Sequence, residues 1–380
     1  MRGEVQGSLL ALDAVPLETV HGRFLAHRFH NLCTGQPALA VACGDLSGGA
    51  PLPARVHSSC ITSEAFGACD CDCAEQLGDA LATIAAAGRG LLFYLSQEGR
   101  GAGFAAKALD RMLVQASGNT VTTFEAYDQL GLARDHRSYD EVAWMLRLLG
   151  VSAPLELLTN NPGKLDALAE LGVAVAGHRP LAVAAHSFSR HYLAAKTGVG
   201  HLLAADPGEV AELPEPVERI VPSPVPGAPR MLTLASYLLP LRARRTEWFR
   251  LHLFFDVARR RERVVLAHGD GREPLVRVQR ERLLERFPLR DRGARGRWQR
   301  AIDAMVDAGG GAALFLPEGE ALRDDDAVLL ASRLPAARAR LLGGDTAGLG
   351  TRLARCGVSL GPPVPLAGDP PAAPALAAIG

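Results

Sequence analysis

A gap-free internal similarity constrains the fold of this chain more than any other feature. Residues 76–95, QLGDALATIAAAGRGLLFYL, align with residues 297–316, RWQRAIDAMVDAGGGAALFL, and a Glu-Gly pair follows each segment at 98–99 and 318–319. Each segment has the pattern of an amphipathic helix that ends at glycines and leads into a short buried strand. Repetition at this length indicates a duplicated unit. The alternative is chance similarity between two alanine-rich helix–strand units.

The remaining periodicity predicts the α/β class. Short apolar runs at 38–43, 91–95 and 155–159 predict strands, and amphipathic stretches at 75–87, 139–149 and 164–171 predict helices. Alternating strands and helices favour mixed sheets with flanking helices. Combined with the internal repeat, this pattern predicts a duplicated α/β fold in which one chain forms a pseudo-dimer.

A proline-rich stretch separates the two copies. Seven prolines between residues 207 and 229 predict an extended, semi-rigid linker. We therefore predict an N-terminal half at 1–205, a linker at 206–230 and a degenerate, non-catalytic repeat half at 231–380.

Composition indicates an ordinary globular protein without a global attraction to nucleic acid. Hydrophobic residues make up 48% and charged residues 22%, and 41 basic side chains balance 41 acidic ones. The sequence has no apolar run of the roughly 18 residues that a membrane-spanning helix needs. Its first residues lack the apolar core of a secretory signal. We expect a cytoplasmic protein with neither nucleic acid nor membrane as a partner.

Four of the seven cysteines fall between residues 60 and 73. Cytoplasmic thiols stay reduced and Cys-x-Cys disulfides close awkward rings, so disulfides are disfavoured. Cys60, Cys71 and Cys73 instead fit a site for one zinc ion, because an extended Cys-x-Cys turns both sulfurs to the same side. Three protein ligands leave a fourth position open for water, whose pKa zinc lowers to about 7, as catalytic sites require.

Two alternatives remain for these cysteines. Cys69 could supply a fourth thiolate and close the site into a structural one, or the thiols could be free. The repeat half contains only Cys356. Whatever the cluster does, only the N-terminal half does it.

Several motifs occur together in the N-terminal half. They are Arg55-Val-His-Ser-x-Cys60-x-Thr62, Cys71-Asp-Cys73, Gln76-Leu77, Gln97-Glu-Gly-Arg100, Gln129-Leu-Gly131, Asp135-x-Arg137 and Leu157-Leu-Thr-Asn-Asn-Pro-x-Lys164. With these motifs, residues 18–204 resemble the GTP cyclohydrolase II family. The resemblance implies zinc-dependent hydrolytic opening of the guanine imidazole ring of GTP in riboflavin-type biosynthesis. Formate and pyrophosphate leave, and a diaminopyrimidinone ribosylamino phosphate remains. It also implies a homodimer.

The resemblance assigns roles to individual residues. It makes Asp135 the general acid/base and Arg137 the nucleophile toward the α-phosphate. A guanidinium is a poor nucleophile, so we expect Arg137 at least to clamp phosphate charge. The alternative for this pair is an ion pair in a solvated loop. The residues that the resemblance places against the substrate are Arg55, Gln76, Glu98, Arg100, Thr123, Thr159 and Lys164.

Elementary chemistry agrees with several of these roles. Glu98 can accept hydrogen bonds from the guanine N1–H and amine. Arg55, Arg100 and Lys164 can hold the triphosphate, with Mg²⁺ bridging its oxygens. The turn at 159–163 precedes a helix and could offer N–H groups to an anion, although a plain turn with a cap is the alternative.

The chain departs from the family pattern at three positions. The family has a tyrosine about eleven residues after Glu-Gly-Arg; counting from Arg100 gives Arg111, and counting back from Thr123 gives Val114. Ser59 stands where the family has an acidic residue, and Asp70 where it has an arginine. We predict that ring opening persists. Alternatives are a variant that keeps the formyl group or uses another guanine nucleotide, and a non-catalytic nucleotide sensor.

The repeat half has two candidate roles. It could replace the partner subunit, which makes the chain a pseudo-dimeric monomer, or it could regulate a chain that is itself a homodimer. His252, His268 and the basic stretch 259–263 could form a ligand site, but a solvated charged turn is the simpler interpretation.

Overall fold

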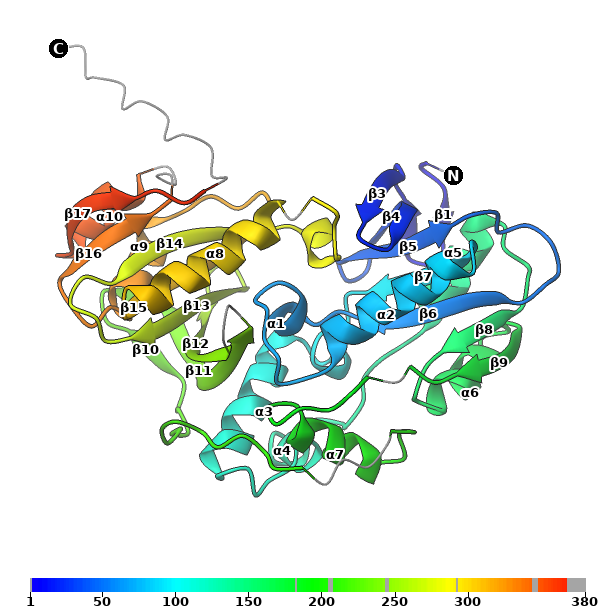
Figure 1. Cartoon of the computed structure of the whole chain (residues 1–380), viewed down its shortest axis with the longest axis horizontal. Helices are drawn as coiled ribbons and strands as arrows, with labels where there is room; N and C mark the ends of the chain where they lie inside the picture. The colour runs from blue at the N-terminus through cyan, green and yellow to red at the C-terminus, as the bar shows by residue number, and fades with distance from the viewer. Residues whose placement is uncertain are drawn as a thin grey trace, which may run out of the picture.

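A computed structural model describes residues 2–181, 183–203, 208–242, 246–291, 293–343 and 348–367. It contains two mixed sheets, each flanked by helices, which lie side by side in Figure 1. The predicted α/β class is confirmed. The start of the predicted linker and the last residues of the predicted repeat half lie outside the described residues. Within the described ranges, no helix combines the length and hydropathy needed to cross a bilayer.

The sheet of the N-terminal half has the order β1-β2-β4-β5-β7-β6-β8-β9, with β3 paired to β4. Its strands are β1 (Val5–Gln6), β2 (Leu9–Ala11), β3 (Val15–Thr19), β4 (Gly22–Asn31), β5 (Pro37–Cys43), β6 (Leu52–Ser58), β7 (Gly90–Leu95), β8 (Leu155–Leu158) and β9 (Val175–Arg179). Pairing is antiparallel from β1 to β7 and parallel from β7 to β9. The carboxyl ends of β6, β7 and β8 therefore meet at one edge, which is where α/β sheets bind ligands.

Helices cover both faces of this sheet. On one face α2 (Cys73–Ala86) packs its apolar side, including Leu81 and Ile84, against β5 and β7. On the other face lie α5 (Asp140–Leu149) and α6 (Gly163–Glu170). β7 is buried along its whole length, because a strand covered on both faces can be apolar throughout.

The sheet of the repeat half has the order β10-β11-β12-β13-β15-β14-β16-β17. Its elements are β10 (Ser223–Val225), β11 (Ala228–Arg242), β12 (Thr246–Asp256), β13 (Arg261–Gly269), β14 (Leu275–Glu281), β15 (Gly310–Pro317), β16 (Arg338–Leu342), β17 (Ser359–Val364), α8 (Gly293–Asp307), α9 (Asp324–Ala331) and α10 (Leu349–Arg355). The change from antiparallel to parallel pairing falls at β15, the counterpart of β7. This agreement is consistent with a duplicated fold.

A buried arginine occurs at the same place in both sheets. Arg55 in β6 donates from Nη1 to the carbonyl oxygen of Leu158 at 2.8 Å, at the end of β8. Arg277 in β14 donates in the same way to the carbonyl oxygen of Leu342 at 3.1 Å, at the end of β16. An arginine in a parallel strand is uncommon, since such strands are mostly apolar. Its repetition supports common ancestry of the halves.

The proline-rich stretch is partly irregular and partly β-strand. Residues 208–222 have no regular structure, but β10 and the start of β11 fall within the predicted linker range. Pro224 is accommodated because β10 is an edge strand, where a missing N–H breaks no ladder.

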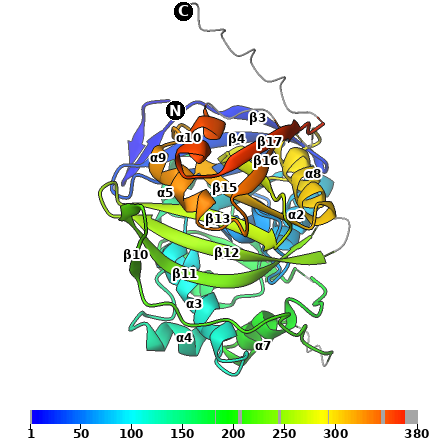
Figure 2. The same cartoon turned by 90° about the vertical axis from the view of Figure 1, so that its left-hand side faces the viewer.

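One buried hydrophobic cluster contains residues of both halves and is called the shared core below. α3 (Phe104–Ala116) of the N-terminal half packs against β11, as Figure 2 shows. Its Met112 lies in the same buried cluster as Tyr237 and Phe315 of the repeat half. Polar contacts fix the register, because the Gln115 side-chain amide both donates to and accepts from the backbone of Leu238, each at 2.7 Å. The halves are therefore a single packed body.

Candidate active site

A pocket of about 420 Å³ opens where β6, β7 and β8 end. Two short helices and one longer helix complete its walls: η1 (Gly99–Gly101), α4 (Thr123–Gln129) and α7 (Arg190–Gly198). All the predicted catalytic and substrate-binding residues line it: Arg55, Gln76, Glu98, Arg100, Thr123, Asp135, Arg137, Thr159 and Lys164. Cys60 and Cys73 line it as well. The structure thus brings the sequence-predicted residues together in one place.

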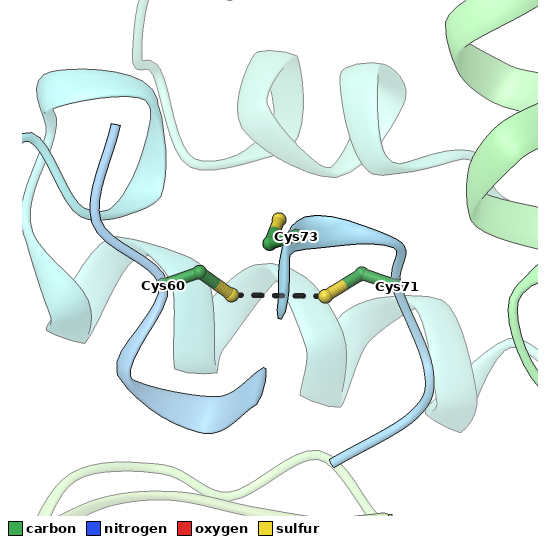
Figure 3. A group of neighbouring side chains, drawn as sticks. All are labelled: Cys60, Cys71 and Cys73. Carbon is green, nitrogen blue, oxygen red and sulfur yellow. Dashed lines mark hydrogen bonds between the residues drawn. The ribbon is translucent and has the colours of Figure 1, made fainter. Parts of the chain in front are cut away.

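The three predicted zinc ligands converge (Figure 3), and two of them, Cys60 and Cys73, line this pocket. The sulfur atoms of Cys60, Cys71 and Cys73 lie within 4.8 Å of one another, and those of Cys60 and Cys71 are 3.6 Å apart. Tetrahedral zinc with Zn–S bonds of about 2.3 Å separates its sulfurs by about 3.8 Å. The residues present therefore fit a zinc ion.

The local geometry differs from the prediction in one respect. Cys71 and Cys73 do not lie in an extended segment; the chain bends at 70–72 and Cys73 is the first residue of α2. Asp72, with φ −102° and ψ 11°, makes the turn into the helix. The sulfurs face the same side because of that turn rather than because of a strand's alternation.

Cys69 points away from the cluster. Its sulfur donates to the carbonyl oxygen of Pro240 in β11 at 3.5 Å. Burial raises the pKa of the Cys69 thiol to about 11, which disfavours the thiolate that a metal needs. The geometry favours three protein ligands over four.

Lys107 in α3 lies directly beside the cluster. Its Nζ is 3.0 Å from the sulfur of Cys60 and also donates to Glu98 at 2.7 Å. Hydrogen bonds from Cys71 and Cys73, together with the Lys107 ammonium, hold the pKa of the Cys60 thiol well below its usual value. Cys60 is thereby kept as the thiolate that binds metals.

Glu98 is more constrained than the sequence suggests. Besides the hydrogen bond from Lys107, Glu98 accepts the backbone N–H of Ile61 at 2.8 Å. Glu98 therefore joins α3 to residues 60–73, the segment that carries the clustered cysteines and is called the cysteine loop below. Burial raises the pKa of Glu98 to about 7. A carboxylate offers about four acceptor sites, so two remain for a ligand.

A chain of hydrogen bonds links Arg55 to α7. The Gln76 side chain accepts from Arg55 and donates to Asp72 at 2.5 Å, and Lys196 donates to the other Asp72 oxygen at 2.8 Å. Asp72 lies between Cys71 and Cys73, so the network fixes the loop that carries these thiols. Gln76 can therefore position this loop in addition to its predicted contact with substrate.

Arg100 is held in a strained conformation. Its φ of +53° is unusual for a residue with a side chain, and such strain concentrates at functional sites. Its guanidinium lies 4.0 Å from the Phe124 ring centroid and donates to Thr123 at 3.1 Å. Buried Nη1 of Arg100 has no hydrogen-bond partner within the described part of the chain, which leaves it available to an anion.

Asp135 and Arg137 form a forked ion pair. Arg137 Nε lies 2.9 Å from one Asp135 oxygen and 3.1 Å from the other. Burial alone raises the pKa of Asp135, but the hydrogen bonds from Arg137 outweigh it and lower the pKa overall. Asp135 is 47% exposed and Arg137 only 14%, so the carboxylate faces the pocket mouth as an ionised base.

Thr159 and Lys164 lie at the end of β8. Lys164 donates to the carbonyl oxygen of Val56 at 2.8 Å, and burial followed by repulsion from Arg55 and Arg137 holds its pKa well below the usual value. The N–H groups of Asn161 and Gly163 bond side chains of the same turn, at 3.1 Å each. The expected backbone anion site is therefore not supported, and Lys164 remains the cation of this wall.

The N-terminal half of this chain is similar to known proteins. The sequence model of the GTP cyclohydrolase II family matches residues 11–180. A GTP cyclohydrolase-2 of Hahella chejuensis is 44% identical over 197 residues, which cover 52% of this chain and 93% of that protein. That of Shewanella amazonensis is 41% identical over 191 residues, covering 50% and 91% respectively. This chain belongs to the GTP cyclohydrolase II family. Membership identifies it as an enzyme of the hydrolase class.

Two departures from the GTP cyclohydrolase II pattern lie next to each other. Of the two positions counted for the missing tyrosine, Arg111 lines the pocket, whereas Val114 is buried in a small apolar cluster. Arg111 Nε lies 3.4 Å from a carboxylate oxygen of Asp70, the residue that replaces the expected arginine. The guanidinium of Arg111 also stacks 4.6 Å from the ring centroid of Tyr192. The substitutions form one new ion pair.

Sequence reasoning missed the residues that α3 and α7 contribute. Lys107 and Asp110 of α3, and Tyr192, Lys196 and His201 of the α7 region, all line the pocket. A signal existed on α3, where charged residues fall among apolar positions at helical spacing. No comparable pattern marks α7, because its contribution depends on its position against the cysteine loop.

Proposed function

We propose that this chain is a zinc-dependent cytoplasmic GTP cyclohydrolase II that hydrolyses the imidazole ring of GTP. The products are formate, pyrophosphate and a diaminopyrimidinone ribosylamino phosphate for riboflavin-type biosynthesis. One observation carries the proposal: three convergent thiols lie at the edge of a pocket that also holds the Asp135–Arg137 pair. The relatives named above share the activity in their names.

The metal site supports this reading through its charge as well as its shape. Zinc bound by Cys60, Cys71 and Cys73 would supply a water of lowered pKa for attack on the purine. Three thiolates and one zinc ion carry a net negative charge, which the adjacent Lys107 ammonium offsets. Cys69, bonded to Pro240, leaves a fourth position available to water.

The pocket suits a polyphosphate. Arg100, Arg137, Lys164 and Lys196 line it, and few acidic groups balance them. The depressed pKa of Lys164 follows from burial and from this crowding of cations, which a polyanion relieves. Mg²⁺ would accompany the triphosphate and bridge its oxygens.

Asp135 and Arg137 divide the proton and charge chemistry between them. Asp135 is ionised and exposed, so it can accept a proton from a reacting group and return it later. Arg137 is held protonated by its hydrogen bond with Asp135, although burial opposes this. We therefore assign Arg137 to stabilising phosphate charge rather than to covalent attack.

The test is the product formed from GTP. Purified protein incubated with GTP and Mg²⁺ should lose guanine absorbance and yield the deformylated pyrimidine, pyrophosphate and formate by mass spectrometry. Asp135→Asn should still bind nucleotide, with turnover reduced by about 100-fold or more. Nucleotide binding by the wild-type protein without any turnover would contradict the proposal and indicate a sensor.

A second candidate is suggested by Arg111. A cation paired with Asp70 and stacked on Tyr192 stands at one of the two positions counted for the missing tyrosine. It could stop the reaction at a formamidopyrimidine or favour another guanine nucleotide. A product heavier by one carbonyl unit, or preferential turnover of GDP or GMP, would identify this variant.

We also propose that the repeat half substitutes for a partner subunit. With Arg55 matched to Arg277, Cys60 corresponds to Arg282, so the repeat half lacks a metal ligand at that position. The buried cluster that contains Met112, Tyr237 and Phe315 already joins the N-terminal half to the repeat half. Light scattering should find a monomer, whereas a dimer would contradict this assignment.

A further inference from the structure

A series of side-chain hydrogen bonds connects the repeat half to the cysteine loop. Arg286, the last residue of the short helix η2 (Leu283–Arg286), donates from Nη1 to the Tyr94 hydroxyl at 3.2 Å. The Tyr94 hydroxyl donates to Glu64, the last residue of α1 (Ile61–Glu64). Glu64 accepts the backbone N–H of Cys60 at 3.2 Å and contacts His57 at 2.7 Å. This series of hydrogen bonds therefore ends at Cys60, a proposed metal ligand.

The direction of each bond follows from the groups involved. An arginine can only donate, so the oxygen of Tyr94 accepts from Arg286 and its single hydrogen is free to bond Glu64. Arg286 is itself fixed by Glu281, at 2.7 Å and 3.1 Å. The hydroxyl of Tyr94 is thereby oriented toward the carboxylate.

Burial makes this orientation important. Glu64 is 1% exposed and Tyr94 is fully buried, so neither can turn to water for a replacement bond. A carboxyl group at this depth is stable only while its hydrogen bonds are made. Removing the hydrogen bond from Arg286 should weaken the bond between Tyr94 and Glu64. Glu64 would then hold the backbone N–H of Cys60 less firmly, so Cys60 would be less well positioned.

The repeat explains why an arginine stands here. When Arg55 is matched to Arg277, Glu64 corresponds to Arg286. Two identical subunits related by a two-fold axis would bring the same residue from each side, and thus two buried glutamates. The substitution in the repeat half replaces that repulsion with a complementary charge.

We propose that Arg286 is a positioning residue of the N-terminal site, through which the repeat half holds the cysteine loop in its metal-binding geometry. The inference rests on the proposed metal site. It assigns the repeat half a direct part in that site instead of a covering role alone.

The experiment uses the full chain and compares Arg286→Met with Arg282→Met. Arg282 lies at the start of the same turn and is 56% exposed, and its ion pairs with described residues are long, at 3.6 Å and 3.7 Å. Amide hydrogen exchange of the metal-free protein is measured over residues 59–66 and, as an internal reference, over β12 and β13. Zinc release to a chelator is measured in parallel.

Arg286→Met should accelerate exchange in 59–66 selectively and zinc release by at least about 10-fold, as loss of outer-sphere support does. Arg282→Met should change neither, and Arg286→Lys should restore part of both. Tyr94→Phe should reproduce the effect, and the double variant should not exceed either single variant, because all act through one chain. Equal changes over the whole protein, or none in 59–66, would overturn the inference. The exchange readout stands even if GTP is not turned over, so the two proposals fail separately.

Discussion

The ammonium of Lys107 lies 3.0 Å from the sulfur of Cys60 and also donates a hydrogen bond to Glu98 at 2.7 Å. It reaches there from α3, a helix that the repeat half holds in place through β11. Charge balance at the proposed metal site should therefore depend on packing between the halves.

Replacing this lysine tests the charge balance. Lys107→Met should weaken zinc affinity by about 10-fold or more, because a buried three-thiolate site would keep an uncompensated negative charge. Competition with a chromophoric chelator measures this. Arg134→Met, on the exposed rim, is the control and should leave affinity unchanged. Equal affinities in all three proteins would show that Lys107 does not act on the metal.

The Asp70–Arg111 pair predicts a stability effect. Asp70→Asn leaves the guanidinium of Arg111, only 9% exposed, without its carboxylate and should cost about 2 kcal/mol in urea unfolding. The Asp70→Asn/Arg111→Met double variant should recover most of this loss, since it no longer buries the Arg111 guanidinium without the Asp70 carboxylate. If the loss in unfolding free energy of the double variant equals the sum of the losses in the two single variants, the two residues are not coupled.

Nucleotide binding should be linked to proton uptake at Lys164. Burial and neighbouring cations lower its pKa in the free protein, and a bound polyphosphate should raise that pKa again. Binding then takes up a proton, so affinity should fall as pH rises through the lowered pKa. Calorimetry of a non-hydrolysable GTP analogue in buffers of different ionisation enthalpy measures the uptake. Lys164→Met should bind with less uptake; an identical proton count in both proteins would refute the link.

Asp135 and Arg137 should separate in steady-state kinetics. Asp135→Asn should lower kcat by about 100-fold or more with little change in KM, because a proton-transfer group acts in the transition state. Arg137→Lys keeps the charge but loses the fork, and should raise KM for GTP. Loss of kcat alone in Arg137→Lys would favour the nucleophile role instead.

The part of the site that sequence could predict is the part built from strand ends. Arg55, Glu98 and Thr159 lie in or just after three adjacent strands, β6, β7 and β8, so their motifs met at one sheet edge. The repeat was visible because helix–strand units keep their apolar spacing when they diverge.

The rest depends on packing that local patterns do not encode. Lys107 and Lys196 come from α3 and α7. The sheet neighbour of α3 is β11 of the other half, which the local sequence pattern around α3 does not reveal. The Cys71–Cys73 segment was predicted as extended but turns at Asp72, since a helix begins there. Arg286 reaches the site from the other half of the chain, which only the shared core reveals.

Zinc content per chain tests the central claim most directly. Elemental analysis should find one zinc ion per chain in the wild-type protein and none in Cys71→Ser. Cys69→Ser should keep its zinc ion, because the sulfur of Cys69 bonds the carbonyl oxygen of Pro240 and not the metal. Absence of zinc from the wild-type protein, or its loss in Cys69→Ser, would contradict a three-thiolate catalytic site.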